Sequence, residues 1–227
     1  MSGIVSYGSY IPYRRLKRAA IAAVLGTPAG RGERAVASFD EDSVSMAVEA
    51  LRDALKHVDI GKVNSLFFAT TTPPYAEKLN AAMIGAAALL PAEIRAADMT
   101  GSIRAGLSAL LQGADSARGG GYCAVTIADA RLGAPEGKVE QSGGDGAAAF
   151  VFGNEGVIAE VEASASLTRE YLDTWRVPSE RFGHSWEERF ALTQAYHPMF
   201  VKVIRDVLEK AKATPGDLAK VIVDAPN

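Results

Sequence analysis

The fold of this chain is decided by the stretch DMTGSIRAGLSAL at positions 98–110. A short apolar run at 94–99 leads through a turn of small residues into a segment with helical spacing. A side chain in such a turn stands at a helix N-terminus, where free N–H groups and the helix dipole lower the pKa of a thiol. The stretch therefore predicts a strand, a turn that presents one reactive side chain, and a helix, although the turn carries no cysteine.

Strands and helices are predicted to alternate along the rest of the chain. The apolar patterns predict strands over 4–10, 66–70, 94–99, 122–128, 147–152 and 157–165. They predict helices over 42–57, 79–90, 104–117 and 199–213. We also expect a helical basic segment at 14–18, a glycine-containing loop at 26–32 and a short strand at 221–223. This order favours an α/β fold with a mixed, largely buried sheet.

The composition limits the class of protein. With 227 residues and 48% hydrophobic content, the chain can bury a core of one domain or two small ones. A net charge of -3 and the lack of a polybasic tract argue against nucleic acid and membrane partners. No apolar run reaches the roughly 20 residues of a membrane span, and the first residues lack signal-peptide features, so we expect a cytoplasmic protein. The single cysteine excludes an internal disulfide or a cysteine-based metal cluster within these residues.

Five segments carry a family resemblance, in matching order and spacing: 40–47, 69–78, 98–110, 134–153 and 173–196. Together they resemble the thiolase superfamily, most closely hydroxymethylglutaryl-CoA synthases of the archaeal type, which are related to ketoacyl synthases of type III. The resemblance implies a thiolase-like layered fold (αβαβα), largely one half of which is present. Residues 1–197 would form the N-terminal half and 198–227 the start of the second.

The resemblance also implies three reaction residues: a glutamate base, a cysteine that carries the acyl group, and a histidine that helps to bind the second carbonyl. In this sequence these slots fall on Thr71, Ile103 and Asp224. Threonine is no base near neutral pH, and isoleucine cannot attack a thioester. We therefore expect the framework of the family without its reaction machinery.

Two other residues, Cys123 and Ser102, carry nucleophilic groups. Cys123 lies in an apolar, β-branched run and is predicted to be a buried structural thiol. Ser102, one residue before the cysteine slot, is a weak candidate, because a hydroxyl without a neighbouring histidine is favoured as a turn or cap residue. Arg104 is a possible anion contact, with a helix-surface ion pair favoured. The glycine clusters and the histidines at 184 and 197 predict neither a cofactor nor a metal site.

A single half would leave a sheet edge and an apolar face uncovered. We expect a homo-oligomer, a complementary thiolase-like subunit, or a sequence that continues beyond these residues. The favoured function is a degenerate, supporting subunit with acyl-CoA as its ligand, beside a catalytic partner and a zinc-ribbon/OB-fold protein of the kind that accompanies archaeal relatives. The alternative is an acyltransferase or aldolase-like enzyme that makes or breaks C–C bonds in acyl-CoA without a cysteine. A third hypothesis is an α/β scaffold with no acyl-CoA role.

Overall fold

The computed structural model describes residues 2–28 and 30–223. The chain divides into two compact units, Met1–Val161 and Glu162–Asn227, each of which is described by itself. Among the described residues, no helix is long and apolar enough to cross a lipid bilayer. The boundary predicted between residues 197 and 198 separates the halves of the family fold, and the division into compact units does not test it.

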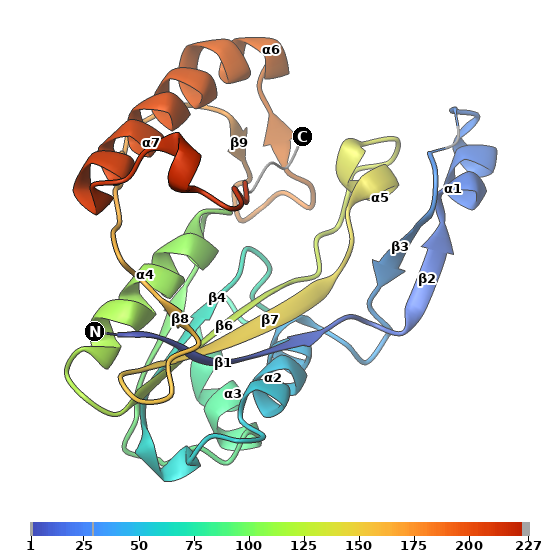
Figure 1. The fold of residues 1–227 in the computed structure, drawn as a ribbon. Coiled ribbons are helices and arrows are strands. Elements are labelled where there is room, and N and C mark those ends of the chain that lie inside the picture. The colour runs from blue at the N-terminus through green and yellow to red at the C-terminus, as the bar shows by residue number, and fades with distance from the viewer. Residues whose placement is uncertain (1, 29, 224–227) are drawn as a thin grey trace. The chain divides into compact units, whose positions relative to one another are not determined.

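A mixed sheet forms the centre of the first unit (Figure 1). Its strand order is β5-β4-β6-β7-β1-β8. The strands are β1 (Gly3–Tyr10), β4 (Val63–Ala69), β5 (Arg95–Met99), β6 (Tyr122–Asp129), β7 (Gly146–Gly153) and β8 (Ala159–Glu160). β4, β5 and β6 run parallel, whereas β7 and β1 join by antiparallel pairing. The predicted α/β fold with a mixed sheet is confirmed, and the carboxyl ends of β4, β5 and β6 lie at one edge.

Helices cover both faces of this sheet (Figure 1). Helices α2 (Ser43–Ala54) and α3 (Asn80–Ala87) pack on one face, and α4 (Ala105–Ala117) packs on the other. The side chains of β6 alternate between the two: Ala124 and Ala128 belong to the α2/α3 core, while Cys123 and Val125 belong to the α4 core. Because both faces are covered, β6 has the continuous apolar sequence of a buried strand.

Local sequence determines where α2 begins and how closely α4 approaches the sheet. Asp42 accepts a hydrogen bond from the backbone N–H of Ser45 (2.7 Å), and the Ser45 hydroxyl accepts one from the Asp42 N–H (2.7 Å), which is a capping box. In α4, a Cβ at Gly113 would lie 2.6 Å from Cγ2 of Val125. Glycine at this position therefore lets the helix backbone lie directly on the sheet.

Two sequence predictions for the first unit are wrong. The basic segment 14–18 is not helical: β2 (Arg14–Lys17) pairs antiparallel with β3 (Glu33–Val36), and α1 (Arg18–Leu25) begins only at Arg18. The strand predicted over 157–165 is limited to β8, since only Gly3 and Ile4 pair with it. The 3-10 helix η1 (Ile60–Lys62) and helix α5 (Lys138–Ser142) complete this unit.

The second unit contains a small hairpin and a long helix. Its elements are β9 (Thr174–Trp175), β10 (His184–Ser185), α6 (Glu188–Ala191), the π-helix η2 (Leu192–Tyr196), α7 (His197–Ala211) and the 3-10 helix η3 (Pro215–Asp217). The helix predicted over 199–213 is confirmed as α7. The strand predicted over 221–223 is wrong, because a strand needs a hydrogen-bonded neighbour and the described residues provide none.

Candidate functional site

Three chain segments meet where the parallel strands of the first unit end. They follow β4 at 70–72 and β5 at 100–104, and at β6 they comprise its last residue, Asp129, and residues 130–131. The Thr70 N–H donates to the Met99 carbonyl oxygen (3.1 Å), which holds the loop after β4 against the end of β5. In open α/β sheets, ligands bind at the carboxyl ends of the strands. This edge is therefore the candidate site, and it carries the predicted slots at Thr71 and Ile103.

A carboxylate that the sequence analysis missed lies at the centre of this edge. Oδ1 of Asp129 accepts hydrogen bonds from the Thr70 hydroxyl (2.9 Å), the Thr71 N–H (2.7 Å) and the Thr72 hydroxyl (3.1 Å). The Thr72 hydroxyl in turn accepts from the Ala130 N–H (3.1 Å). An acidic residue at the end of an apolar strand was the available signal. Its partners could not be identified from sequence, because they lie on a different strand's loop.

The Thr71 side chain occupies the predicted glutamate slot without a partner. Its Oγ1 is buried and forms no hydrogen bond with the described residues. Its backbone N–H is held by Asp129. Position 71 therefore has no carboxylate of its own, but its backbone is hydrogen-bonded to the carboxylate of Asp129.

The predicted nucleophile slot and its neighbour belong to the turn before α4. Ile103 is 36% exposed, so an aliphatic side chain stands at this position. The Ser102 hydroxyl accepts from the Arg104 N–H (3.2 Å), and its carbonyl accepts from the Ala105 N–H (2.9 Å). Ser102 thus serves as a turn residue. Asp224, the predicted histidine slot, lies outside the described residues, and the assignment of all three slots stays a prediction.

Cys123 is the structural thiol that its sequence context predicts. It is fully buried in β6. Burial raises the pKa of this thiol to about 11, against the smaller lowering effects of Ser65, Arg95 and Ser116. At neutral pH the group is protonated and inaccessible, so it is unsuited to act as a nucleophile.

A second carboxylate near this edge, that of Asp98, accepts hydrogen bonds with both of its oxygens. Oδ1 of Asp98 accepts from the Ala81 N–H (2.7 Å), and Oδ2 accepts from the Asn80 N–H (2.8 Å) and its side-chain amide (2.9 Å). Asp98 therefore caps α3 from strand β5. The same Asn80 amide donates to the carbonyls of Tyr75 and Lys78, which fixes the loop before α3.

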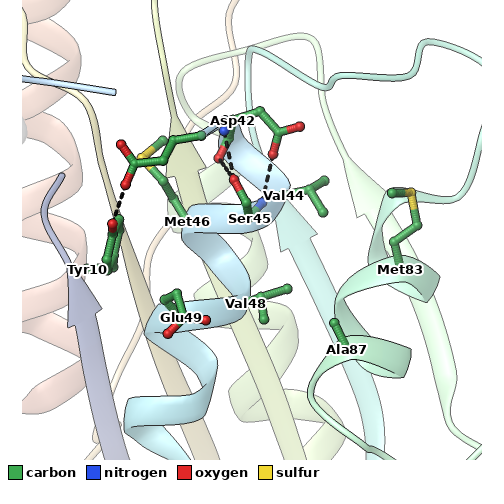
Figure 2. Close-up of a pocket in the computed structure, with 10 residues that line it drawn as sticks. Tyr10, Asp42, Val44, Ser45, Met46, Val48, Glu49, Met83 and Ala87 are labelled. Carbon is green, nitrogen blue, oxygen red and sulfur yellow. Dashed lines mark hydrogen bonds between the residues drawn. The ribbon is translucent and has the colours of Figure 1, made fainter. Parts of the chain in front are cut away.

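A pocket of about 390 Å³ lies on the α2/α3 side of the sheet (Figure 2). Apolar side chains of both helices line it, among them Val44, Val48 and Met83. Acidic residues also line it, and Glu41 accepts a hydrogen bond from Tyr10, whose pKa is raised by that bond and by burial. Neither Thr71 nor Ile103 lines this pocket, so it is separate from the slots.

A basic pocket of about 230 Å³ lies between α1 and α5. Two cationic side chains, Arg18 and Lys138, line it together with neutral residues (Ile21, Ala22, Pro28, Gly30, Gln141 and Ser142). Arg18 donates to the Ser142 carbonyl (3.2 Å), while its Nε is buried without a hydrogen-bond partner among the described residues. Such a pocket suits an anionic group.

Among the described residues, no cluster of His, Cys, Asp and Glu could hold a metal ion.

Solved structures place the fold in a known class. The chain superposes on a hydroxymethylglutaryl-CoA synthase complexed with CoA with a TM-score of 0.87 and 17% identity, covering 96% of this chain and 58% of that one. It superposes on the priming β-ketosynthase of the R1128 polyketide pathway with a TM-score of 0.80 and 21% identity, covering 96% and 72%. The protein therefore has a thiolase-like fold.

Curated relatives identify the family within that class. The hydroxymethylglutaryl-CoA synthase of Methanopyrus kandleri is 32% identical in an alignment of 239 positions, which covers 99% of this chain and 67% of the relative. That of Thermoplasma volcanium is 33% identical over 239 residues, covering 100% and 68%. No protein-family model matches the chain. The chain belongs to the hydroxymethylglutaryl-CoA synthase family and spans about two thirds of the length of these relatives.

Proposed function

We propose that this hydroxymethylglutaryl-CoA synthase-like protein of acyl-CoA metabolism binds an acyl-CoA but forms no acyl-enzyme, and that it supports a partner subunit. The observation that carries the proposal is the aliphatic Ile103 in the turn before α4, where the family resemblance implies a cysteine. The membership of the family supports acyl-CoA as the ligand class. We further propose a cytoplasmic location.

The absence of an acyl-enzyme is tested by native mass spectrometry of the protein isolated from its own cells. With acetyl-CoA, we expect no acetyl mass on this chain, because no accessible thiol stands at the helix start. The Ile103→Cys, Thr71→Glu double variant should gain one acetyl mass, and the Thr71→Glu single variant should gain none. An acetyl mass on the unaltered chain would contradict the proposal.

The basic pocket between α1 and α5 is our proposed site for the phosphate groups of CoA. A related structure is complexed with CoA, and the phosphates of CoA are anions that Arg18 and Lys138 can bind. Isothermal titration with CoA should show about tenfold weaker binding for Arg18→Ala and for Lys138→Ala, since one charge-assisted contact contributes about 1.5 kcal/mol. Lys56→Ala, whose lysine pairs with Asp53 on α2, is the control and should bind CoA normally.

The partner we propose is a second copy of this chain or a complementary thiolase-like subunit. The first unit leaves apolar side chains uncovered on α4, with Leu107 54% exposed. Related structures were solved in complex with an acyl carrier protein, which shows that members of this fold class engage other proteins. A zinc-ribbon/OB-fold protein remains a further proposed member of the assembly.

One observation favours a second function, the making or breaking of C–C bonds without a cysteine. Chemistry of this kind needs a base beside the thioester rather than a thiol. The carboxylate of Asp129 accepts a hydrogen bond from the backbone N–H of Thr71, where the family resemblance implies a base, and this contact supports the second function. The chain can support a partner subunit and also transfer a proton at this edge, because neither role requires an acyl-enzyme.

A further inference from the structure

We infer that Asp129 is a catalytic residue of this chain that accepts a proton from the carbon next to the thioester of a bound acyl-CoA. The inference rests on the proposed binding of acyl-CoA and goes beyond it, because it assigns chemistry to a site that lacks the family's glutamate and cysteine. Three features of the sheet edge support it. Asp129 lies on the face of the sheet that carries α4, its Oδ2 accepts no hydrogen bond within the described residues, and the Thr71 hydroxyl has no partner there.

Asp129 lies on the same side of the sheet as the predicted nucleophile slot. Along β6, Cys123 and Val125 belong to the α4 core, and side chains alternate from face to face with a period of two. Asp129, the last residue of the strand, continues that series. The first turn of α4 packs on this face of β6, because a Cβ at Gly106 would be 3.3 Å from Cγ2 of Ile127. The Asp129 carboxylate therefore lies at the end of β6, on the face against which the helix after Ile103 begins.

The hydrogen bonds of Asp129 use only one of its two oxygens. All three donors, from Thr70, Thr71 and Thr72, converge on Oδ1. Within the described residues no donor is hydrogen-bonded to Oδ2, and the residue is half-buried rather than enclosed. The carboxylate is thus held in a fixed orientation with one acceptor oxygen to spare. Asp98, by contrast, has both oxygens occupied by α3 and is a structural carboxylate.

Thr71, whose backbone N–H is bonded to Oδ1 of Asp129, also has an unsatisfied side-chain hydroxyl. The Thr71 hydroxyl is buried without a partner, although its own backbone N–H is bonded to Asp129. Buried polar groups nearly always have partners, so an orphan marks a place where a polar group from outside the chain is expected. A thioester with its carbonyl oxygen is a group of this kind.

The proposed step is a reversible proton transfer. The C–H bond next to the thioester carbonyl breaks, and its proton goes to Oδ2 of Asp129. The electron pair of that bond moves to form the enolate, whose charge rests on the thioester oxygen. Return of a proton from the Asp129 carboxyl group, or of a deuteron after exchange with solvent, restores the acyl-CoA. No oxidant, metal ion or covalent intermediate takes part in this balance.

The test is deuterium exchange into acetyl-CoA. The protein, in the complex isolated from its own cells, is incubated with acetyl-CoA in D₂O, and deuterium in the acetyl group is measured by mass spectrometry. We expect exchange above the buffer rate, and at least a tenfold loss in Asp129→Asn, because positioned general bases contribute about 10² to 10⁴ in rate. The amide oxygen of asparagine can still accept from Thr71, so the turn is retained.

Three further measurements separate a catalytic from a structural role. CoA binding by Asp129→Asn should equal that of the unaltered protein. Adding Thr71→Glu to Asp129→Asn should restore at least part of the exchange, since it returns a carboxylate to the neighbouring position. Asp98→Asn should exchange at the normal rate per folded molecule. If Asp129→Asn does not fold, Asp129→Glu is measured instead, and the same tenfold loss is expected because its carboxylate is displaced.

The outcomes distinguish the inference from the function on which it rests. CoA binding without exchange in the unaltered protein, or normal exchange in Asp129→Asn, overturns the inference and leaves the binding proposal standing. Failure to bind CoA at all overturns both.

Discussion

At the scale of single residues, the sheet edge contains two carboxylates that differ in how their oxygens are used. Asp98 holds a helix with both oxygens, whereas Asp129 holds a loop with one. Sequence analysis placed the slots at Thr71 and Ile103 because local motifs carry them. It missed Asp129 because its significance depends on donors 57 to 59 positions away, and only the pairing of β4 with β6 brings these together.

The pKa of Cys123 predicts a pH-dependent stability. The thiol titrates at about 11 in the folded chain, against 9.0 as its ordinary value. Between these values the unfolded chain loses the proton first, so the stabilising effect is complete below pH 9 and is lost as pH rises toward 11. The full loss is about 2–3 kcal/mol. The melting temperature should fall less between pH 8 and pH 10.5 in Cys123→Ala than in the unaltered protein. Equal falls in the two proteins would contradict the prediction.

At the scale of elements, the strongly periodic segments were predictable and the short ones were not. The helix starting at Asp42 and the buried strand at 122–128 carry signals for their own conformation: a cap and a β-branched run. The segment 14–18 lacks such a signal. Residues 14–17 become a strand because residues 33–36 pair with them, a tertiary effect that overrides local propensity. For the same reason 221–223, without a partner strand, is not extended into a sheet.

Close packing of α4 predicts that Gly113 tolerates no side chain. A methyl group there would lie 2.6 Å from Val125 and 2.8 Å from Phe152, so Gly113→Ala should destabilise the fold by about 1–3 kcal/mol. Urea denaturation measures the change. Gly119→Ala, just beyond the same helix, meets only the Ser116 carbonyl oxygen at 3.6 Å and serves as the control. A stable Gly113→Ala protein would show that α4 can move away from the sheet.

The end of α3 contains a strained leucine. Leu89 has a φ of 58° and is 81% exposed, so it takes the left-handed conformation that glycine adopts at helix ends without a steric penalty. Leu89→Gly should stabilise the protein by about 0.5–1 kcal/mol, because relief of strain exceeds the added backbone entropy. The matched change Leu107→Gly, at an exposed leucine inside α4, should destabilise by about 1 kcal/mol. Melting temperatures that shift in the same direction would refute this explanation.

At the scale of the whole molecule, the chain forms a complete sheet but leaves part of its surface without a partner. β5 is an edge strand, bonded on one side only by β4 among the described residues. Leu107 on α4 is exposed, and no residue of α7 in the second unit is buried. These uncovered surfaces agree with the sheet edge and the apolar face that the family resemblance predicts.

The proposed association through α4 predicts that a charge at Leu107 weakens the assembly. Leu107→Glu should shift the protein to smaller species in native mass spectra, since burial of the carboxylate would oppose contact. Its circular dichroism should be unchanged. Val24→Glu, at an 86% exposed valine on α1, is the control and should leave the assembly intact. An unchanged assembly in Leu107→Glu would exclude this helix face from the interface.

The position of the slots just beyond the strand ends has a consequence for how such a chain can change over generations. β4 ends at Ala69 and β5 at Met99, so Thr71 and Ile103 belong to neither buried core. A substitution at either position removes almost none of the apolar contacts that drive folding. A duplicated gene could therefore lose one chemistry and acquire another in a few single steps, with every intermediate still folded and available for selection.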